Sequence, residues 1–118
     1  MKKKNRVLKT QEFHTMIHTG TKVMNSSFVL YLMPKKEEEA RFGISLARKY
    51  GNAVVRNKVK RQVRMMCQDL IDFTDFPVDG ILIVRKSYQS LSFEDNKKNL
   101  EKLLSKATMK EIFKKEPI

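Results

Sequence analysis

The 118-residue chain has no tryptophan and a single cysteine, Cys67. One cysteine cannot form an intrachain disulfide, and a lone thiol suits a protein of the reducing cytoplasm. No apolar run approaches the roughly 18 residues of a membrane span, and the basic start, residues 1–6, leads into no apolar signal segment. The chain also lacks internal repeats. We therefore expect one domain over residues 1–118, with a core drawn from the 41% of residues that are apolar.

What the chain has in excess is positive charge, and that charge is concentrated. The formal net charge is +12, and the stretch 41–64 carries eight basic residues and no acidic one. The segments 1–40, 65–91 and 92–118 carry only +4, −2 and +2. Charge gathered in this way predicts a polyanionic partner. An acidic membrane is the weaker candidate, because the basic stretch has no Trp or Phe to insert beside its aliphatic residues.

Hydrophobic periodicity predicts an α+β fold, with helices packed on a single layer of sheet. Helices are expected over about 10–20, 52–71 and 92–110, and strands at 22–24, 27–33, 41–47 and 80–85. The strands at 27–33 and 41–47 are most simply joined as an antiparallel hairpin. A basic N-terminal tail, 1–6, should be flexible or lie on the partner, and a Lys-rich tail, 110–118, should fray.

Capping residues predict where the helices begin and end. Thr10 and Asn52 are expected N-caps, and Gly20 is expected to end the first helix. Ser92, followed three residues later by Asp95, resembles a capping box for the last helix.

The central helix is amphipathic. Its apolar positions recur at spacings of three and four residues, at Val55, Val59, Val63, Met66 and Leu70. The opposite side carries polar residues, with Lys58 at its edge: Arg56, Asn57, Lys60, Arg61 and Arg64. Like charges at i, i+4 and i+8 repel one another, at a cost of about a few tenths of a kcal/mol per pair. Because phosphate would neutralise them, this helix is predicted to be a nucleic-acid-binding surface.

Other candidate sites are weaker. His14 and His18 stand one helical turn apart, but neither the glutamate of a zinc hydrolase nor a third ligand accompanies them. Cys67 lies towards the apolar side of its helix and is expected to be a buried small hydrophobe. Four acids are spread over a helix end and a turn, where we expect solvation rather than a two-metal site: Asp69, Asp72, Asp75 and Asp79. The protein by itself therefore looks non-catalytic.

Two aromatic residues remain ambiguous on these grounds. Phe13 and Tyr31 could be ordinary core residues, or they could line a shallow trough in which unstacked bases lie on the rings.

The run from Gly51 to Arg64, GNAVVRNKVKRQVR, closely resembles the signature of the bacterial ribonuclease P protein subunit. Similar features flank it: Asn5-Arg6 ahead of the helix with Phe13, the strand Phe28-Val29-Leu30-Tyr31, and Phe42-Gly43-Ile44-Ser45 ahead of Lys49. The similarity covers about residues 5–106. It implies a four-stranded, mostly antiparallel sheet with three helices and a left-handed βαβ crossover, against the usual handedness.

The resemblance also implies an activity. The family's protein joins a catalytic RNA, and the complex is an endonuclease that removes the 5′ leader of precursor tRNA. The chemistry belongs to the RNA and to Mg²⁺ that the RNA mainly holds, while the protein binds the leader. The implied partners are thus the catalytic RNA and the leader; neither a membrane nor DNA is expected. The alternative function is that of a small structural protein that binds ribosomal RNA.

Site residues follow from the resemblance by position. Those expected to bind RNA are Lys49, Asn52, Arg56, Asn57, Lys58, Lys60, Arg61 and Arg64. Those expected to line the leader cleft are Phe13, Ile17 and Tyr31, with Lys49 nearby. Two positions depart from the family pattern. Ile17 stands where a second cleft aromatic is frequent, and Lys58 replaces the commoner Arg, which keeps the charge but loses the bidentate fork.

Overall fold

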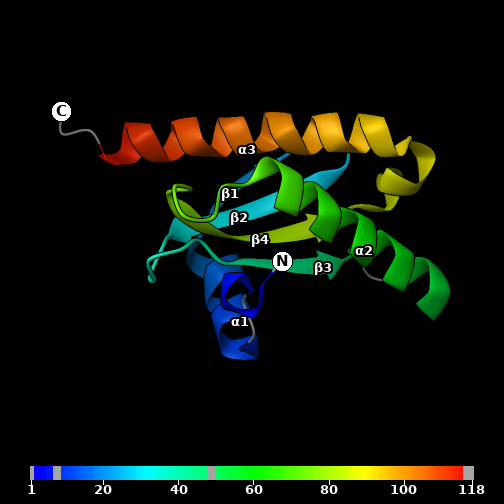
Figure 1. Ribbon diagram of the computed structural model, residues 1–118, viewed down its shortest axis with the longest axis horizontal. Helices are drawn as coiled ribbons and strands as arrows, with labels where there is room; N and C mark the ends of the chain where they lie inside the picture. The colour runs from blue at the N-terminus through cyan, green and yellow to red at the C-terminus, as the bar shows by residue number, and fades with distance from the viewer. Residues whose placement is uncertain (1, 7–8, 48–49, 116–118) are drawn as a thin grey trace.

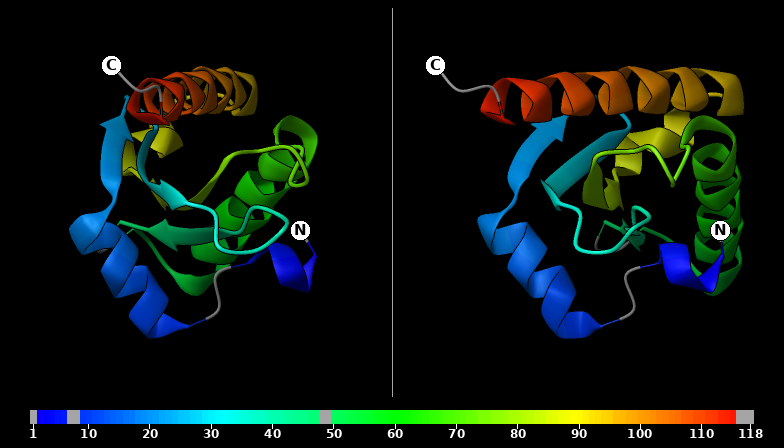
Figure 2. Two further views of the ribbon diagram at one scale, coloured as in Figure 1. Left: turned by 90° about the vertical axis from the view of Figure 1, so that its left-hand side faces the viewer. Right: turned by 60° about the vertical axis from the view of Figure 1, so that its left-hand side comes forward.

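The structure, a computed structural model, describes residues 2–6, 9–47 and 50–115, with side chains up to residue 108. Its elements follow in the order η1 (Lys3–Asn5), α1 (Thr10–Thr19), β1 (Thr21–Met24), β2 (Phe28–Pro34), β3 (Phe42–Leu46), α2 (Ala53–Leu70), β4 (Val78–Val84), η2 (Lys86–Ser90) and α3 (Phe93–Lys115). The sheet lies at the centre, with α1 on one side and α2 and α3 on the other (Figures 1 and 2). The predicted α+β class is confirmed.

The four strands form one sheet in the order β1-β2-β4-β3. The pairs β1–β2 and β2–β4 are antiparallel, whereas β3 and β4 are parallel. The predicted hairpin between β2 and β3 is therefore wrong, because β4 is inserted between them and satisfies the backbone groups of both. Leu82 is the central point of this arrangement, since it is opposite Leu30 on one side and Ile44 on the other.

Helix α2 connects the two parallel strands. In Figure 1, β3 and β4 both point to the right, β4 lies above β3, and α2 crosses on the near side of the sheet. Figure 2 places α2 and α1 on opposite sides. This path makes the β3–α2–β4 connection left-handed, as the resemblance implied and against the usual preference.

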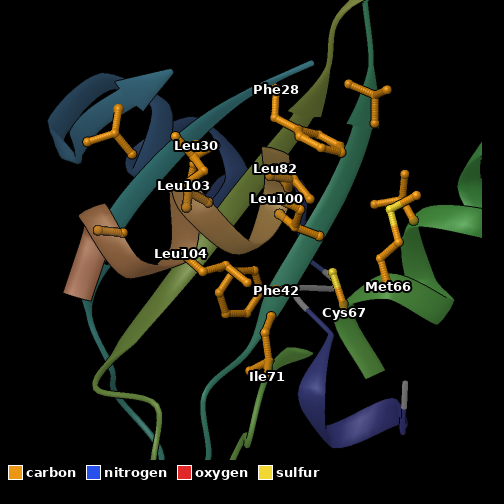
Figure 3. Close-up of a cluster of buried hydrophobic side chains, with 14 of the residues drawn as sticks. Phe28, Leu30, Phe42, Met66, Cys67, Ile71, Leu82, Leu100, Leu103 and Leu104 are labelled. Atoms are coloured by element: carbon orange, nitrogen blue, oxygen red, sulfur yellow. The ribbon is translucent and has the colours of Figure 1, made fainter. Parts of the chain in front are cut away.

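One face of the sheet carries the main core. Strand β2 alternates strictly, with Phe28, Leu30 and Leu32 fully buried towards α2 and α3. Side chains of both helices complete this cluster, among them Met66, Cys67, Leu100 and Leu103 (Figure 3). The apolar face predicted for α2 is thus confirmed, and α3 contributes a buried apolar face of its own.

The helix ends partly follow the predicted caps. The Asn52 side chain accepts a hydrogen bond from the Val55 N–H at 3.0 Å, so Asn52 is the N-cap of α2. Ser92 Oγ accepts from the Asp95 N–H at 3.1 Å, which is one half of a capping box. Thr10, however, is already helical: Lys9 is at the N-cap of α1 and contributes no side-chain cap. Helix α3 continues to Lys115, so helical backbone covers much of the segment expected to fray.

Residues 4 and 5 of the N-terminal segment are held on the domain, contrary to the expectation of a flexible tail. Asn5 is buried, and its Nδ2 donates to the Ala40 carbonyl at 3.1 Å and to Glu39 Oε1 at 3.2 Å. Lys4 Nζ pairs with Glu39 Oε2 at 2.6 Å. The positive charge of residues 2–6 is therefore fixed beside the loop between β2 and β3. None of the described helices combines the length and apolar character needed to cross a membrane.

Candidate nucleic-acid interface

The basic face of α2 gathers five basic side chains on one helix. It comprises Arg56, Asn57, Lys58, Lys60, Arg61 and Arg64. Four of the six, Asn57, Lys58, Arg61 and Arg64, are exposed. Arg56 and Lys60 are half-buried at the border with the apolar side, not opposite it as the sequence pattern suggested. Their aliphatic stems cover apolar surface while their charged ends remain available.

None of the five cations of the basic face has an ion-pair partner among the described residues, where Lys4, Arg41 and Lys97 are paired instead. Asp69, the acid on the same helix, pairs instead with Lys97 of α3 at 3.0 Å. Arg56 and Lys58 also lie near the positive end of the helix dipole, where cations are disfavoured. The protein alone therefore leaves this repulsion uncompensated, and phosphate groups would relieve it.

Asn52, which is predicted to bind RNA, also has a structural role at the start of α2. Its side-chain oxygen is occupied by the cap, and its NH2 group has no partner among the described residues. The preceding Gly51 has φ = +147°, a backbone conformation that side chains rarely adopt, so glycine is required where the chain turns into α2. Local backbone geometry thus positions the start of the basic face.

The second surface lies on the other side of the sheet, under α1. Its apolar residues form what we call the open face: Phe13, Ile17, Tyr31, Met33 and Ile83, all only partly buried around the buried pair Met16 and Ile81. Tyr31 and Met33 alternate along β2 with Phe28, Leu30 and Leu32, whose side chains enter the main core. Phe13 and Tyr31 thus pack at the partly exposed edge of this small cluster, and the open face brings the three predicted cleft residues together.

Gly43 explains how Phe13 reaches the sheet. A Cβ on Gly43 would lie 2.5 Å from Cζ of the Phe13 ring and 2.9 Å from Cδ1 of Ile81. The ring thus lies directly on the backbone of β3, in space that any side chain at residue 43 would fill. This contact fixes α1 across the sheet.

A cation accompanies the aromatic ring on β2. Lys22 of β1 is opposite Tyr31 in the β1–β2 register, and its Nζ lies 5.9 Å from the centre of the Tyr31 ring. Tyr31 thus presents a partly exposed ring beside a positive charge, the combination that suits stacking of a base next to its phosphate.

An ionic cluster ties α1 to the sheet. Arg41 Nη2 contacts Glu12 Oε2 at 2.8 Å and Asp79 Oδ2 at 3.3 Å, while Asp79 Oδ1 accepts from the Arg41 N–H at 2.8 Å. The Arg41 hydrogen bond lowers the pKa of Glu12, and the same bond is the main cause that raises the pKa of Arg41. Asp79 is buried, so its prediction as a solvated acid is wrong.

The other residues considered in the sequence do not come together as a site among the described residues. The imidazoles of His14 and His18 stack at 6.2 Å between ring centres. Among the described residues, no group of three or more His, Cys, Asp or Glu side chains could hold a metal ion. Cys67 is fully buried, as predicted, and burial raises its pKa to about 12. Lys49 lies outside the described residues.

Sequence reasoning missed Lys22, Met33 and Ile83 as members or neighbours of the open face. Met33 follows Tyr31 by two residues, so strand alternation could have placed it there. Lys22 and Ile83 are brought to Tyr31 and Val29 by strand pairing, which the sequence does not specify.

Comparison with known proteins gives a consistent result. The family model described as Ribonuclease P matches residues 1–108. The ribonuclease P protein component of Bacillus velezensis is 44% identical over 110 residues, which cover 92% of this chain and 94% of that protein.

Solved structures agree with the sequence comparison. The RNase P protein of Staphylococcus aureus superposes with a TM-score of 0.75 at 32% identity, over 87% of this chain and 94% of that one. The Thermotoga maritima RNase P protein gives a TM-score of 0.72 at 26% identity, over 86% and 96%.

Proposed function

Since the chain belongs to the ribonuclease P protein family, it is the protein component of an RNA-containing endoribonuclease that processes the 5′ leader of precursor tRNA, and we propose which of its surfaces binds which RNA. The basic face of α2, together with Asn52, binds the catalytic RNA. The open face under α1 binds the single-stranded leader. The two surfaces lie on opposite sides of the sheet (Figure 2), so the domain bridges the two RNAs.

The observation that carries the proposal is the unpaired charge of the basic face. Arg61 and Arg64 are exposed without acidic partners among the described residues, whereas Arg41 forms ion pairs with two carboxylates. Arginine forks and lysine ammonium groups are the side chains that bind phosphate best. The partly exposed Tyr31 ring beside Lys22 supports leader binding in the same way, since stacking needs no particular base.

We assign the Mg²⁺ ions of the reaction mainly to the RNA. The described residues offer no grouped carboxylates that could hold such an ion, and the basic face would repel one. In the proposed complex its cations neutralise phosphates, and they help to organise ions only through the RNA. The role of the protein is then to bind and position, while bond cleavage belongs to the RNA.

The direct test mixes the purified protein with a bacterial ribonuclease P RNA at low Mg²⁺ and a precursor tRNA. Stimulated release of the leader is expected, and the protein without RNA should release none. If the RNA cleaved equally well with and without the protein, the proposal would be refuted. A structural ribosomal RNA-binding protein would give that result.

The salt dependence of RNA binding tests the basic face itself. If its five cations each neutralise one phosphate, raising salt from about 50 to about 200 mM should weaken binding by about 100- to 500-fold. Replacing Arg61 with Ala should reduce the slope of log affinity against log salt by the amount that corresponds to about one phosphate contact. A flat response would show that the basic face is only a solvated surface.

A further inference from the structure

A cavity of about 270 Å³ lies beside the basic face, where α2 meets η2 and the first turn of α3. In Figure 2 the start of α3 and η2 stand next to α2. The lining includes Val55, Lys58 and Gln62 from α2, Gln89 from η2, and Leu91 and Phe93 beyond it. Typical pockets for small ligands are about 300–1,000 Å³, so this one has room for a single flat ring system and little more.

The apolar part of the lining is unusually exposed. Leu91 and Phe93 are each 37% exposed, and Val55 is half-buried. Phe93 is the first residue of α3, a position at which packing of the core does not require an aromatic side chain. The ring is therefore available for contact with a group that enters the cavity.

The polar part of the lining is pre-oriented. The Tyr88 hydroxyl donates to Gln62 Oε1 at 2.9 Å, and Gln89 Nε2 donates to the Tyr50 carbonyl at 2.8 Å. Each glutamine is thus held by one end of its amide. The other ends, the Nε2 donor of Gln62 and the Oε1 acceptor of Gln89, have no partner among the described residues. A fixed donor and a fixed acceptor beside an aromatic ring complement a nucleobase, whose edges carry adjacent acceptors and donors.

Lys58 connects this cavity with the proposed RNA surface, because it belongs to the basic face and also lines the cavity. We propose that the cavity receives one unstacked nucleobase of the RNA held by the basic face, with Phe93 contacting the base and the amides of Gln62 and Gln89 bonding its edge. The proposal rests on the proposed function and deepens it. The basic face binds phosphates, and the cavity adds a contact to a base. The charge around the cavity favours RNA over an apolar peptide as its occupant.

The test compares Phe93→Ala and Gln89→Ala with the control Val54→Ala, which removes a side chain that is 77% exposed on α2 and does not line the cavity. Affinity for a bacterial ribonuclease P RNA is measured at several salt concentrations. Phe93→Ala should weaken binding by about 5- to 150-fold, the factor that corresponds to stacking of one base. Because no phosphate contact is lost, the salt slope should stay unchanged.

Chemical probing of the RNA provides a second readout that does not depend on the stability of the variants. With wild-type protein, at least one unpaired base should become protected from base-specific modification, and Gln89→Ala should restore its reactivity. Backbone protection from hydroxyl radicals should persist with both variants. Equal affinities and identical base protection for wild type, Phe93→Ala and Gln89→Ala would overturn the proposal. Failure of the wild-type protein to bind RNA at all would instead refute the proposed function.

Discussion

The two faces of the sheet are built from the same strands but are covered very differently. On the face towards α2 and α3, Phe28, Leu30 and Leu32 are at most 1% exposed. On the face towards α1, their immediate neighbours Tyr31 and Met33 remain partly exposed. Alternation along β2 sends successive side chains to opposite faces, so a single strand supplies both the core and the open face.

This difference would separate the residues that stabilise the fold from those proposed to bind the leader. Apolar burial, the dominant favourable contribution to folding, is concentrated under α2 and α3. The helix on the other side, α1, buries only Met16 against the sheet, beside Ile81, and is otherwise held by the Phe13 ring on Gly43 and the ion pairs of Arg41. Helix α1 leaves part of the apolar open face uncovered, where it is available for a ligand. Truncating the side chains of the open face should therefore cost little stability. Substitutions on the two faces should therefore have different consequences.

Leu30→Ala should have the largest effect on stability. Leu30 is fully buried in the main core, and truncation of such a residue costs about 2–5 kcal/mol through lost burial and the cavity left behind. Urea unfolding followed by circular dichroism measures the loss. Val29→Ala, at a half-buried position on the opposite face of the same strand, is the matched control and should cost clearly less. Equal losses would contradict the division between the faces.

Tyr31→Ala should impair binding more than folding. If a base stacks on this ring, affinity for leader-bearing precursor tRNA should fall by roughly 1–3 kcal/mol. Leaderless tRNA, assayed with the same holoenzyme, should bind unchanged. An equal loss for both substrates would show that Tyr31 acts through the structure of the domain rather than through the leader.

Glu12→Gln should loosen α1 in a pH-dependent way. Arg41 lowers the pKa of Glu12 in the folded state, so the carboxylate contributes stability above its unfolded pKa of about 4.3, and that contribution is lost as pH falls through the lower folded pKa. At neutral pH the substitution should cost about 1–2 kcal/mol of unfolding free energy. In urea titrations at successive pH values, the gap between wild type and variant should close in acid. A constant gap would point to packing rather than charge.

Ile17→Phe should produce the smallest change, in the opposite direction. A second aromatic ring on the open face would add a stacking contact, and affinity for leader-bearing substrate should rise by about 0.5–1 kcal/mol. Val54→Phe places the same ring at a position on α2 that is 77% exposed and on the other side of the sheet from the open face, and should leave affinity unchanged. Equal gains from Val54→Phe and Ile17→Phe would contradict the prediction.

Features determined by neighbouring residues could be predicted from the sequence. Helix α2 is an example, because its N-cap Asn52 and its apolar period lie within a few turns of one another. The open face could be anticipated only in part. The resemblance named Phe13, Ile17 and Tyr31, but the helix and the strand come together through the tertiary fold.

Features that depend on distant pairing could not be predicted from local pattern. A hairpin of β2 and β3 was the simplest connection, yet β4 pairs with both, and only the resemblance indicated the crossover. Asp79 looked like a solvated acid because Arg41 is 38 residues away along the chain. The parallel register of β3 and β4 brings the two together and buries the carboxylate.

The reactivity of the buried Cys67 thiol can report when the folded domain opens around it. Thiolate is the reactive form of cysteine, and a pKa of about 12 with complete burial suppresses it in the folded state. Alkylation should therefore proceed only when α2 separates from the sheet, and its rate would measure how often that happens. Because Cys67 lies on the helix that carries the basic face, the same reaction can show whether bound RNA holds that helix closed.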